Sequence, residues 1–130
     1  MALLLNADSR EIAFVKNATE GLNLVANATR DCGLVAVAPS EHHSNLLPWR
    51  ERDYAYLPLM QDGSIDLEGS LALIHERRPG VLALSLVSNV LGVKNPVAEL
   101  VGAARELGAV TILDASQAVG HVPLDVRLLA

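Results

Sequence analysis

The stretch AVTILDASQAVG at residues 109–120 constrains the fold of this chain more than any other. It contains a short apolar run that ends on an acidic residue. Residues 109–113 have the length and composition of one buried strand, and Asp114 stands where that strand should end. Gln117 follows three residues later, and Gly120 closes a turn. Because open α/β sheets bind their ligands at the carboxyl ends of parallel strands, this acid predicts a ligand site.

The rest of the chain alternates apolar runs with amphipathic segments. Strands are expected at residues 12–15, 34–38, 81–87 and 109–113, with an edge strand at 54–57. Helices are expected at residues 18–28, 41–52 and 66–77. A further helix is expected to begin at Asn95-Pro96, which supply an N-cap and a first-turn proline, and to end at Gly108. One more element is expected to start within residues 123–130. Continuously apolar strands that alternate with such helices indicate an α/β fold, a three-layer α/β/α domain with a mostly parallel sheet.

Composition limits the classes of protein that this chain can represent. Its 130 residues suffice for one domain, and an apolar fraction of 51% predicts a packed core rather than disorder. The net charge of −5, without a basic run, argues against a nucleic-acid partner. The apolar runs are strand-sized, well below the roughly 20 residues of a membrane span, so no membrane partner is expected. A single cysteine, Cys32, is typical of the reducing cytoplasm, where we expect the protein to act.

Polar groups that can carry chemistry cluster where the predicted strands end. Free N–H groups and a hydroxyl at the helix start Asn17-Ala18-Thr19 can hold a phosphate. Glu41-His42-His43 follows the second strand, Ser88-Asn89 follows the third, and Asp114 with Gln117 follows the last. Each motif also has a plainer interpretation, as an N-cap, a surface histidine pair, a turn, or a turn-capping aspartate. Their shared position at one edge of the sheet favours a single ligand site.

Two other kinds of site are not expected. A metal site is disfavoured because the chain has one cysteine and because His75 and His121 form no recognisable ligand spacing with the other histidines. A nucleotide-binding domain is disfavoured because neither glycine-rich phosphate-binding motif occurs. The groups at the strand ends instead suit one flat, anionic cofactor that contains a nitrogen.

Four longer motifs follow one another along the chain. They are NATEGLN at residues 17–23, EHHSNLLPW at 41–49, VSNVLG at 87–92 and DASQAVGH at 114–121. These motifs resemble the class V aminotransferase family, in particular its cysteine desulfurase and selenocysteine lyase branch, which uses pyridoxal 5′-phosphate (PLP). The resemblance covers nearly the whole chain, and it implies that residues 1–130 are a partial PLP-binding large domain.

The resemblance also implies a role for each matching residue. The helix start Ala18-Thr19 would hold the PLP phosphate, and His42 would stack on the pyridine ring. Asp114 would bond to the protonated ring nitrogen and Gln117 to the phenolic oxygen of the ring, with Asn89 near that oxygen and the substrate carboxylate. The substrate would be a small amino acid, cysteine or selenocysteine, cleaved at its C–S or C–Se bond to give alanine. A homodimer and a sulfur-acceptor protein are implied as partners.

Two groups that the family uses have no match in this sequence. Family members bind PLP as an imine on a lysine downstream of the Asp114 motif, and neither Lys16 nor Lys94 corresponds to it. The nucleophilic cysteine of the desulfurases also lies further downstream, and Cys32 matches no catalytic position. We therefore expect a fragment with little or no desulfurase activity of its own, with weak or absent PLP binding, and with self-association through the apolar surface of a partial sheet.

Two local differences leave other functions open. Lys16-Asn17-Ala18-Thr19 stands where desulfurases usually have serine-glycine, and this variant resembles epimerase-like members of the family. Leu86 stands where desulfurases often carry a histidine beside the substrate side of the pocket. The alternatives are another class V enzyme, either an aminotransferase or an epimerase-like one, or a noncatalytic α/β module that binds a ligand or a protein partner.

Overall fold

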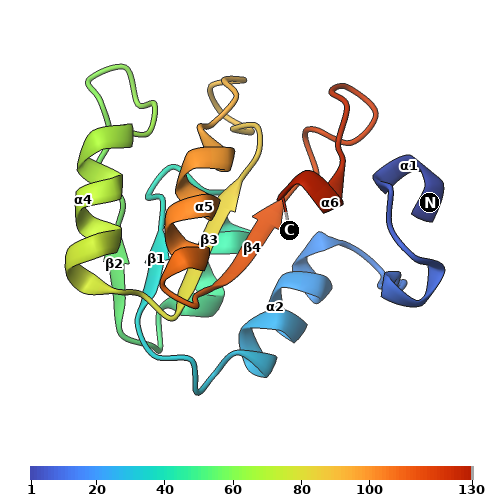
Figure 1. The fold of residues 1–130 in the computed structure, drawn as a ribbon, viewed down its shortest axis with the longest axis horizontal. Helices are drawn as coiled ribbons and strands as arrows, with labels where there is room; N and C mark the ends of the chain where they lie inside the picture. The colour runs from blue at the N-terminus through green and yellow to red at the C-terminus, as the bar shows by residue number, and fades with distance from the viewer. Residues whose placement is uncertain (130) are drawn as a thin grey trace.

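The computed structural model describes residues 1–129, and its centre is one sheet of four strands (Figure 1). The strands are β1 (Val35–Val37), β2 (Tyr54–Tyr56), β3 (Val81–Ser85) and β4 (Val110–Asp114). They lie in the order β2-β1-β3-β4, and all three neighbouring pairs are parallel. The register places Val37 beside Ala83 and Ser85 beside Asp114.

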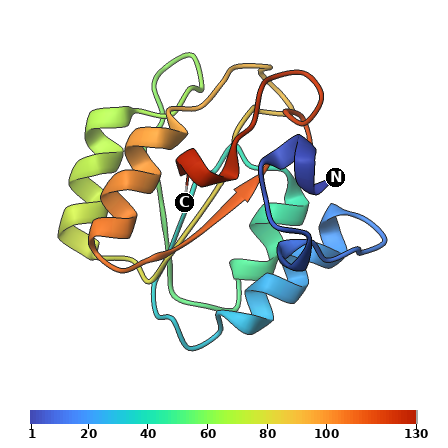
Figure 2. The same cartoon turned by 45° about the vertical axis from the view of Figure 1, so that its right-hand side comes forward.

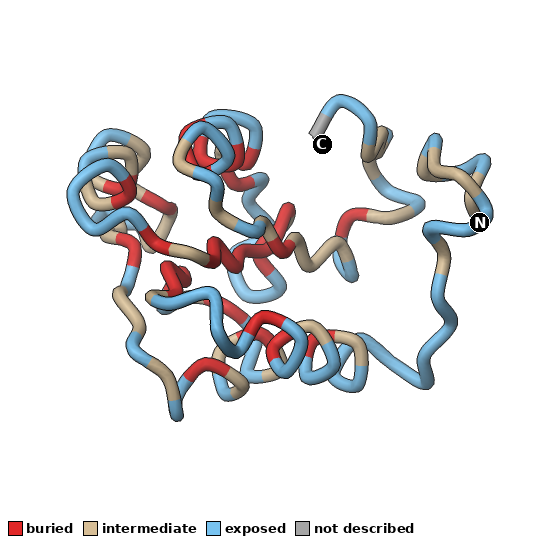
Figure 3. The backbone as a smooth tube through the Cα atoms, turned by 60° about the horizontal axis from the view of Figure 1, so that its bottom comes forward, coloured by how far each residue is buried: buried red, intermediate tan, exposed pale blue. Residues whose placement is uncertain are grey.

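Helices cover both faces of this sheet and give the three layers that the sequence predicted (Figure 3). One face carries α2 (Ala18–Ala28) with the short α3 (His43–Leu46) and the 3₁₀ turn η2 (Leu47–Trp49). The other face carries α4 (Leu67–Arg77) and α5 (Val97–Glu106). The remaining short elements, on the β4 side of the sheet, are α1 (Ala2–Leu5), η1 (Ser9–Glu11) and α6 (Val126–Leu129) (Figures 1 and 2).

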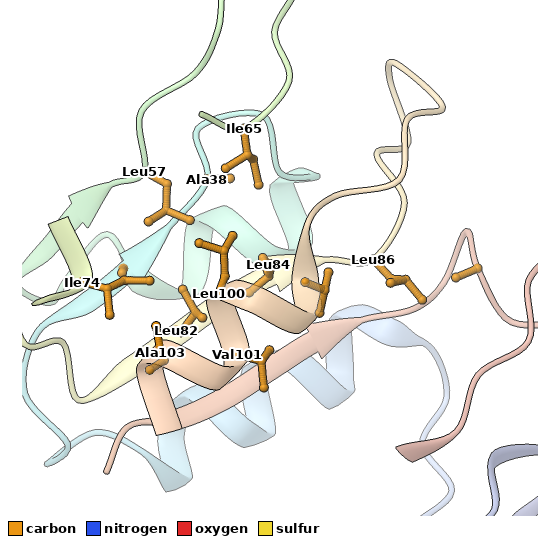
Figure 4. Packing of buried hydrophobic residues seen from close by; sticks show 14 residues of the cluster. Ala38, Leu57, Ile65, Ile74, Leu82, Leu84, Leu86, Leu100, Val101 and Ala103 are labelled. Atoms are coloured by element: carbon orange, nitrogen blue, oxygen red, sulfur yellow. The ribbon is translucent and has the colours of Figure 1, made fainter. Parts of the chain in front are cut away.

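Alternate residues of the central strands point into two separate cores. Ala36, Leu82 and Leu84 lie under α4 and α5, where they meet Ile74 and Leu100 (Figure 4). The residues between them pack against α2 and against Trp49, and these are Val35, Val37, Val81 and Ala83. Because β1 and β3 are covered on both faces, each appears in the sequence as a continuous apolar run. The predictions at 34–38 and 81–87 are therefore confirmed, although β3 ends at Ser85.

Capping side chains set the start of two long helices. Asn17 Oδ1 accepts a hydrogen bond from Glu20 N at 2.9 Å at the start of α2, and Asp66 Oδ1 accepts one from Gly69 N at 3.1 Å at the start of α4. The prediction for α5 is wrong in one detail, because its N-cap is Pro96 and not Asn95. Asn95 is buried, and its Nδ2 donates to Ser85 O at 2.8 Å.

Two predicted elements near the amino terminus are wrong. Residues 12–15 form no strand among the residues described, and Phe14 is 88% exposed, because no neighbouring strand supplies hydrogen bonds there. Residues 41–52 do not form one helix. Instead, α3 ends at Leu46 and η2 follows, because Pro48 has no N–H group to continue the helical ladder.

The predictions at the carboxyl-terminal side are confirmed in part. β4 lies one residue later than the expected 109–113 and ends on Asp114. It is an edge strand and not a buried one, with Ile112 buried and Val110 41% exposed. The element expected within 123–130 is α6, and Ala130 lies outside the described residues. Arg127 holds this region to the amino-terminal segment through an ion pair with Glu11 at 2.9 Å.

Candidate functional site

The order of the strands creates a natural ligand-binding position between β1 and β3. The connection from β1 leads to β2 on one side, whereas β3 pairs with β1 on the other side. In α/β sheets, ligands bind outside the carboxyl ends of the strands at such a switch in strand order.

A pocket of about 370 Å³ lies at this position. Every residue that the sequence analysis proposed for cofactor binding lines it, namely Ala18, Thr19, His42, Asn89, Asp114 and Gln117. The pocket is completed by Asn17, Ser44, Ser85, Val87 and Ser116. A larger hollow of about 980 Å³ lies near the amino ends of β1 and β2, beside Gly33 and Asp53, and it contains none of these proposed residues. The structure thus brings together groups that come from four separate loops.

The start of α2 forms one wall of the pocket. The first N–H groups of a helix have no partner within the helix, and the helix dipole makes this end attractive to anions. The Thr19 hydroxyl stands beside these groups and lies 2.7 Å from Ser44 Oγ. This wall can therefore bind a phosphate through N–H groups and a hydroxyl.

His42 forms a second wall and is held from one side of its ring. Its Nδ1 accepts a hydrogen bond from Ser44 N at 3.2 Å and lies 3.0 Å from Ser44 Oγ. Because a backbone N–H can only donate, this contact assigns the proton of the neutral imidazole to Nε2. The exposed ring can present its face or its Nε2–H to a ligand.

Asp114 stands at the end of β4, and its side chain is shared between a turn and the pocket. Oδ1 accepts from Ser116 N at 2.9 Å and from Ser116 Oγ at 2.5 Å. Oδ2 makes no hydrogen bond with the residues that the structure describes, and the side chain is half-buried. The turn-capping interpretation of Asp114 is thus correct, and it leaves one carboxylate oxygen for a ligand.

A second carboxylate, that of Glu41, is hydrogen-bonded to Ser85, which lines the pocket. Glu41 is 7% exposed, and its Oε1 accepts from Ser85 N at 2.8 Å. Its Oε2 accepts from Asn45 Nδ2 at 2.8 Å and from Ser85 Oγ. Burial raises the pKa of this carboxyl above its ordinary range, the hydrogen bonds from Ser85 and Asn45 oppose that rise, and the charge of Asp114 adds to it.

Comparison with known proteins identifies the family. The model described as Aminotransferase class-V matches residues 1–130. The chain belongs to the class V aminotransferase family. A cysteine desulfurase of Escherichia coli O1:K1 / APEC is 37% identical over 140 residues, which cover 98% of this chain and 34% of that protein. The chain therefore spans about a third of the length of the curated relatives that it matches.

Solved structures of cysteine desulfurases share the fold. The apo structure of the enzyme from Thermococcus onnurineus NA1 has a TM-score of 0.91 and 33% identity, and the match covers 98% of this chain and 34% of that one. An enzyme from Escherichia coli has a TM-score of 0.84 and 31% identity, with coverage of 98% and 35%. The class V family is PLP-dependent, and these neighbours place the chain within the corresponding α/β fold.

Several other polar residues considered in the sequence analysis do not line the pocket that contains Thr19, His42 and Asp114. Ser88 Oγ accepts from Val90 N at 3.3 Å and from Leu91 N at 3.2 Å, so its turn interpretation is correct. Cys32 is exposed in the loop before β1, at the opposite end of the sheet. Lys16 and Lys94 are exposed, and neither lines the pocket.

Leu86 also lies outside the pocket that contains Thr19, His42 and Asp114. It is 4% exposed and packs in the core under α4 and α5. Leu86 is therefore not among the residues that line the described pocket.

The pocket is also lined by three serines that were not predicted from the sequence, namely Ser44, Ser85 and Ser116. A signal for Ser85 was present, because it is the one hydroxyl in the apolar run at residues 81–87. A buried hydroxyl needs a hydrogen-bond partner, and polar partners gather where strands end. Ser116 stands two residues after Asp114, which is the spacing of an Asx turn.

Residues 1–129 contain neither a membrane-spanning helix nor a cluster of metal-binding side chains. No helix there is long and apolar enough to span a membrane. No group of three or more histidine, cysteine, aspartate or glutamate side chains there is arranged to hold a metal ion.

Proposed function

We propose that the protein is a PLP-dependent cysteine desulfurase and that these residues form the central, cofactor-binding part of its large domain. The observation that carries the proposal is the pocket in which Thr19, His42 and Asp114 meet at the switch between β1 and β3. The identity of 37% to a cysteine desulfurase supports this reaction, which releases alanine from cysteine. Selenocysteine is proposed as a second substrate, because cleavage of its C–Se bond needs the same pocket.

The groups in the pocket fit PLP on chemical grounds. Thr19 and the N–H groups at the start of α2 would hold the phosphate, and Asp114 Oδ2 is available to accept a hydrogen bond from a protonated ring nitrogen. His42 would lie against the ring, while Gln117 and Asn89 would bind polar atoms at its edge. When bound, PLP supplies an electron sink for bond cleavage next to the amino group of the substrate.

These residues alone would contribute binding and orientation rather than the complete reaction. Asp114 would keep a proton on the ring nitrogen, and the dipole of α2 would neutralise part of the phosphate charge. Neither Lys16 nor Lys94 lines the pocket, so neither is placed to bond covalently to PLP there. We therefore propose that the polypeptide of residues 1–130 binds PLP weakly and has little or no desulfurase activity by itself.

The assignments beyond the family are proposals as well. We propose that the protein acts in the cytoplasm as a homodimer and passes sulfur to an acceptor protein. Another class V activity, such as an aminotransferase or an epimerase-like enzyme, is the second candidate, and the Lys16-Asn17-Ala18-Thr19 sequence at the phosphate wall favours it. A noncatalytic module would keep the pocket and use it for a different anion.

A PLP titration followed by absorbance tests the proposed pocket. We expect saturable binding that Asp114→Ala weakens by about tenfold or more, because a charge-assisted hydrogen bond contributes about 1.5–3 kcal/mol. The matched control is Asp62→Ala, since Asp62 Oδ1 also accepts hydrogen bonds from the serine two residues later, Ser64, at 3.0 Å and 2.6 Å, but in an exposed turn.

The outcomes of this titration separate the candidate functions. Folded wild-type protein without PLP binding, or with equal binding in Asp114→Ala, would argue for the noncatalytic module. Binding followed by alanine release from cysteine in the full protein supports the desulfurase. Binding with transfer of the amino group instead would favour the aminotransferase.

A further inference from the structure

The carboxyl end of β3 extends beyond its neighbour β1. β1 pairs with β3 as far as Val37, which lies beside Ala83, and the chain then leaves the sheet. This would leave the N–H group of Ser85 without a partner at the centre of the sheet, where an unpaired donor is costly. Glu41 Oε1 accepts from that N–H group at 2.8 Å, so a side-chain carboxylate continues the ladder.

The second oxygen of Glu41 connects β3 to the turn that carries His42. Glu41 Oε2 accepts from Ser85 Oγ and from Asn45 Nδ2, the latter at 2.8 Å. Asn45 is fully buried in α3, and its backbone N–H donates to His42 O at 2.8 Å. One buried carboxylate therefore fixes the position of the His42 turn relative to the end of β3.

Ser85 also links Glu41 to Asp114. Ser85 and Asp114 are register partners in β3 and β4, and the next residue, Leu86, donates its N–H to Asp114 O at 2.9 Å. We propose that Glu41 is a positioning residue of the pocket whose buried charge acts together with Asp114 to hold a protonated nitrogen base. The inference rests on the proposed function for the identity of that base, the ring nitrogen of PLP.

The charges around Glu41 agree with this role. The groups that contact its carboxylate are Ser85 of β3 and Asn45 of α3, and the charged group that acts on it is Asp114 of β4. Burial, opposed by the hydrogen bonds from Ser85 and Asn45, raises the pKa of the Glu41 carboxyl, and repulsion from Asp114 raises it further. A cation beside Asp114 would be attracted by both carboxylates, more strongly than in water because the site is partly buried.

The substitution Glu41→Gln separates charge from shape. The Oδ1 atom of Asn45 is buried and has no hydrogen-bond partner in residues 1–129. If the amide of Asn45 turns over, the NH₂ group of glutamine can donate to this oxygen and to Ser85 Oγ, while its carbonyl oxygen still accepts from Ser85 N. The variant can thus keep Ser85 and Asn45 as hydrogen-bond partners while losing its negative charge, although the bonds to Asn45 and to Ser85 Oγ reverse direction and Asn45 Nδ2 takes the position that has no partner.

The first test needs no cofactor. The carboxyl carbon of Glu41 is followed by NMR against pH in the wild-type full chain, in Asp114→Asn and in the control Asp62→Asn. We expect the titration of Glu41 to move to lower pH in Asp114→Asn and to stay in place in Asp62→Asn. An unchanged titration of Glu41 in Asp114→Asn overturns the proposal.

The second test uses PLP as the probe and records its absorbance in the bound state against pH. We expect Glu41→Gln to bind PLP about tenfold more weakly and to shift the absorbance change to lower pH, because the nitrogen base loses its proton more readily. Glu106→Gln, an exposed carboxyl in the last turn of α5, should change neither. If Glu41→Gln binds PLP with wild-type affinity and its absorbance change has the wild-type midpoint in pH, the proposed role of Glu41 is refuted. If wild-type protein binds no PLP, the proposed function fails, and the NMR titration alone decides the coupling of the two carboxylates.

Discussion

Asp114 and Asp62 each accept two hydrogen bonds at Oδ1 from the serine two residues later. Their local turns are alike, so the surroundings decide which of them can bind a ligand. Asp114 was predictable because an apolar run marks the strand that it ends. The contacts of Glu41 were not predictable, because its partner Ser85 lies 44 residues away and meets it only after β1 and β3 have paired.

At the scale of this residue, the pH dependence of stability offers a further test of Glu41. Its pKa in the folded state is raised above the ordinary value of 4.5, so the folded chain binds this proton more readily than the unfolded chain. Above the pKa of the folded state, the buried ionised carboxylate therefore lowers the free energy of unfolding by its full amount. This destabilisation disappears as the pH falls through the pKa of the folded state and the carboxyl takes up its proton. We expect Glu41→Gln to gain free energy of unfolding relative to wild type as the pH rises from the ordinary pKa of glutamate through the raised pKa of Glu41.

Urea unfolding followed by circular dichroism across this pH range would measure that difference. Subtracting the wild-type curve removes the contributions of exposed carboxyls such as Asp62, whose pKa is lowered by its hydrogen bonds with Ser64. Glu106→Gln is the control, and its free energy of unfolding should differ from that of wild type by the same amount at every pH. A flat difference for Glu41→Gln as well would mean that burial does not disfavour its ionised form.

At the scale of elements, the sequence predicts what depends on local pattern and misses what depends on neighbours. α2, α4 and α5 combine an apolar face with an end signal, and each forms where it was expected. Residues 12–15 have a strand-like composition, but the isolated run finds no strand to pair with, and Phe14 stays exposed. The position of β4 at the edge of the sheet also could not be predicted, because its apolar sequence is typical of a strand with neighbours on both sides.

The two leucines of α2 test how this helix is held to the sheet. Leu22 is 7% exposed and packs in the core with Val35 and Trp49, whereas Leu24 on the same helix is 59% exposed. Leu22→Ala should lower the free energy of unfolding by about 2–4 kcal/mol, because it leaves a cavity, and Leu24→Ala should change it by less than about 0.5 kcal/mol. Denaturant titrations would measure both variants. Equal effects would show that α2 is not docked through Leu22, which would also leave the Thr19 wall of the pocket without support.

At the scale of the whole molecule, the site and the edge of the sheet belong to the same strand. β4 carries Asp114 at its carboxyl end and presents its outer side without a paired strand within residues 1–129. The pocket itself depends on the assembled sheet, because its walls come from loops that are up to about 100 residues apart, from Asn17 to Gln117. Sequence motifs could suggest that these loops meet, but only the strand order β2-β1-β3-β4 brings them to one position.

The outer side of β4, which pairs with no strand within residues 1–129, predicts how this polypeptide associates with itself. An unpaired strand edge with apolar side chains can pair with another chain, and Val110 in β4 is 41% exposed. We expect the polypeptide of residues 1–130 to associate in a concentration-dependent way in sedimentation velocity experiments, and Val110→Lys to weaken this association, because a charge on an edge strand disfavours pairing. Val90→Lys is the control, since Val90 is 75% exposed in the loop after β3 and lies off the edge. If Val90→Lys dissociates the protein and Val110→Lys does not, the loop and not the edge of the sheet is the contact between molecules.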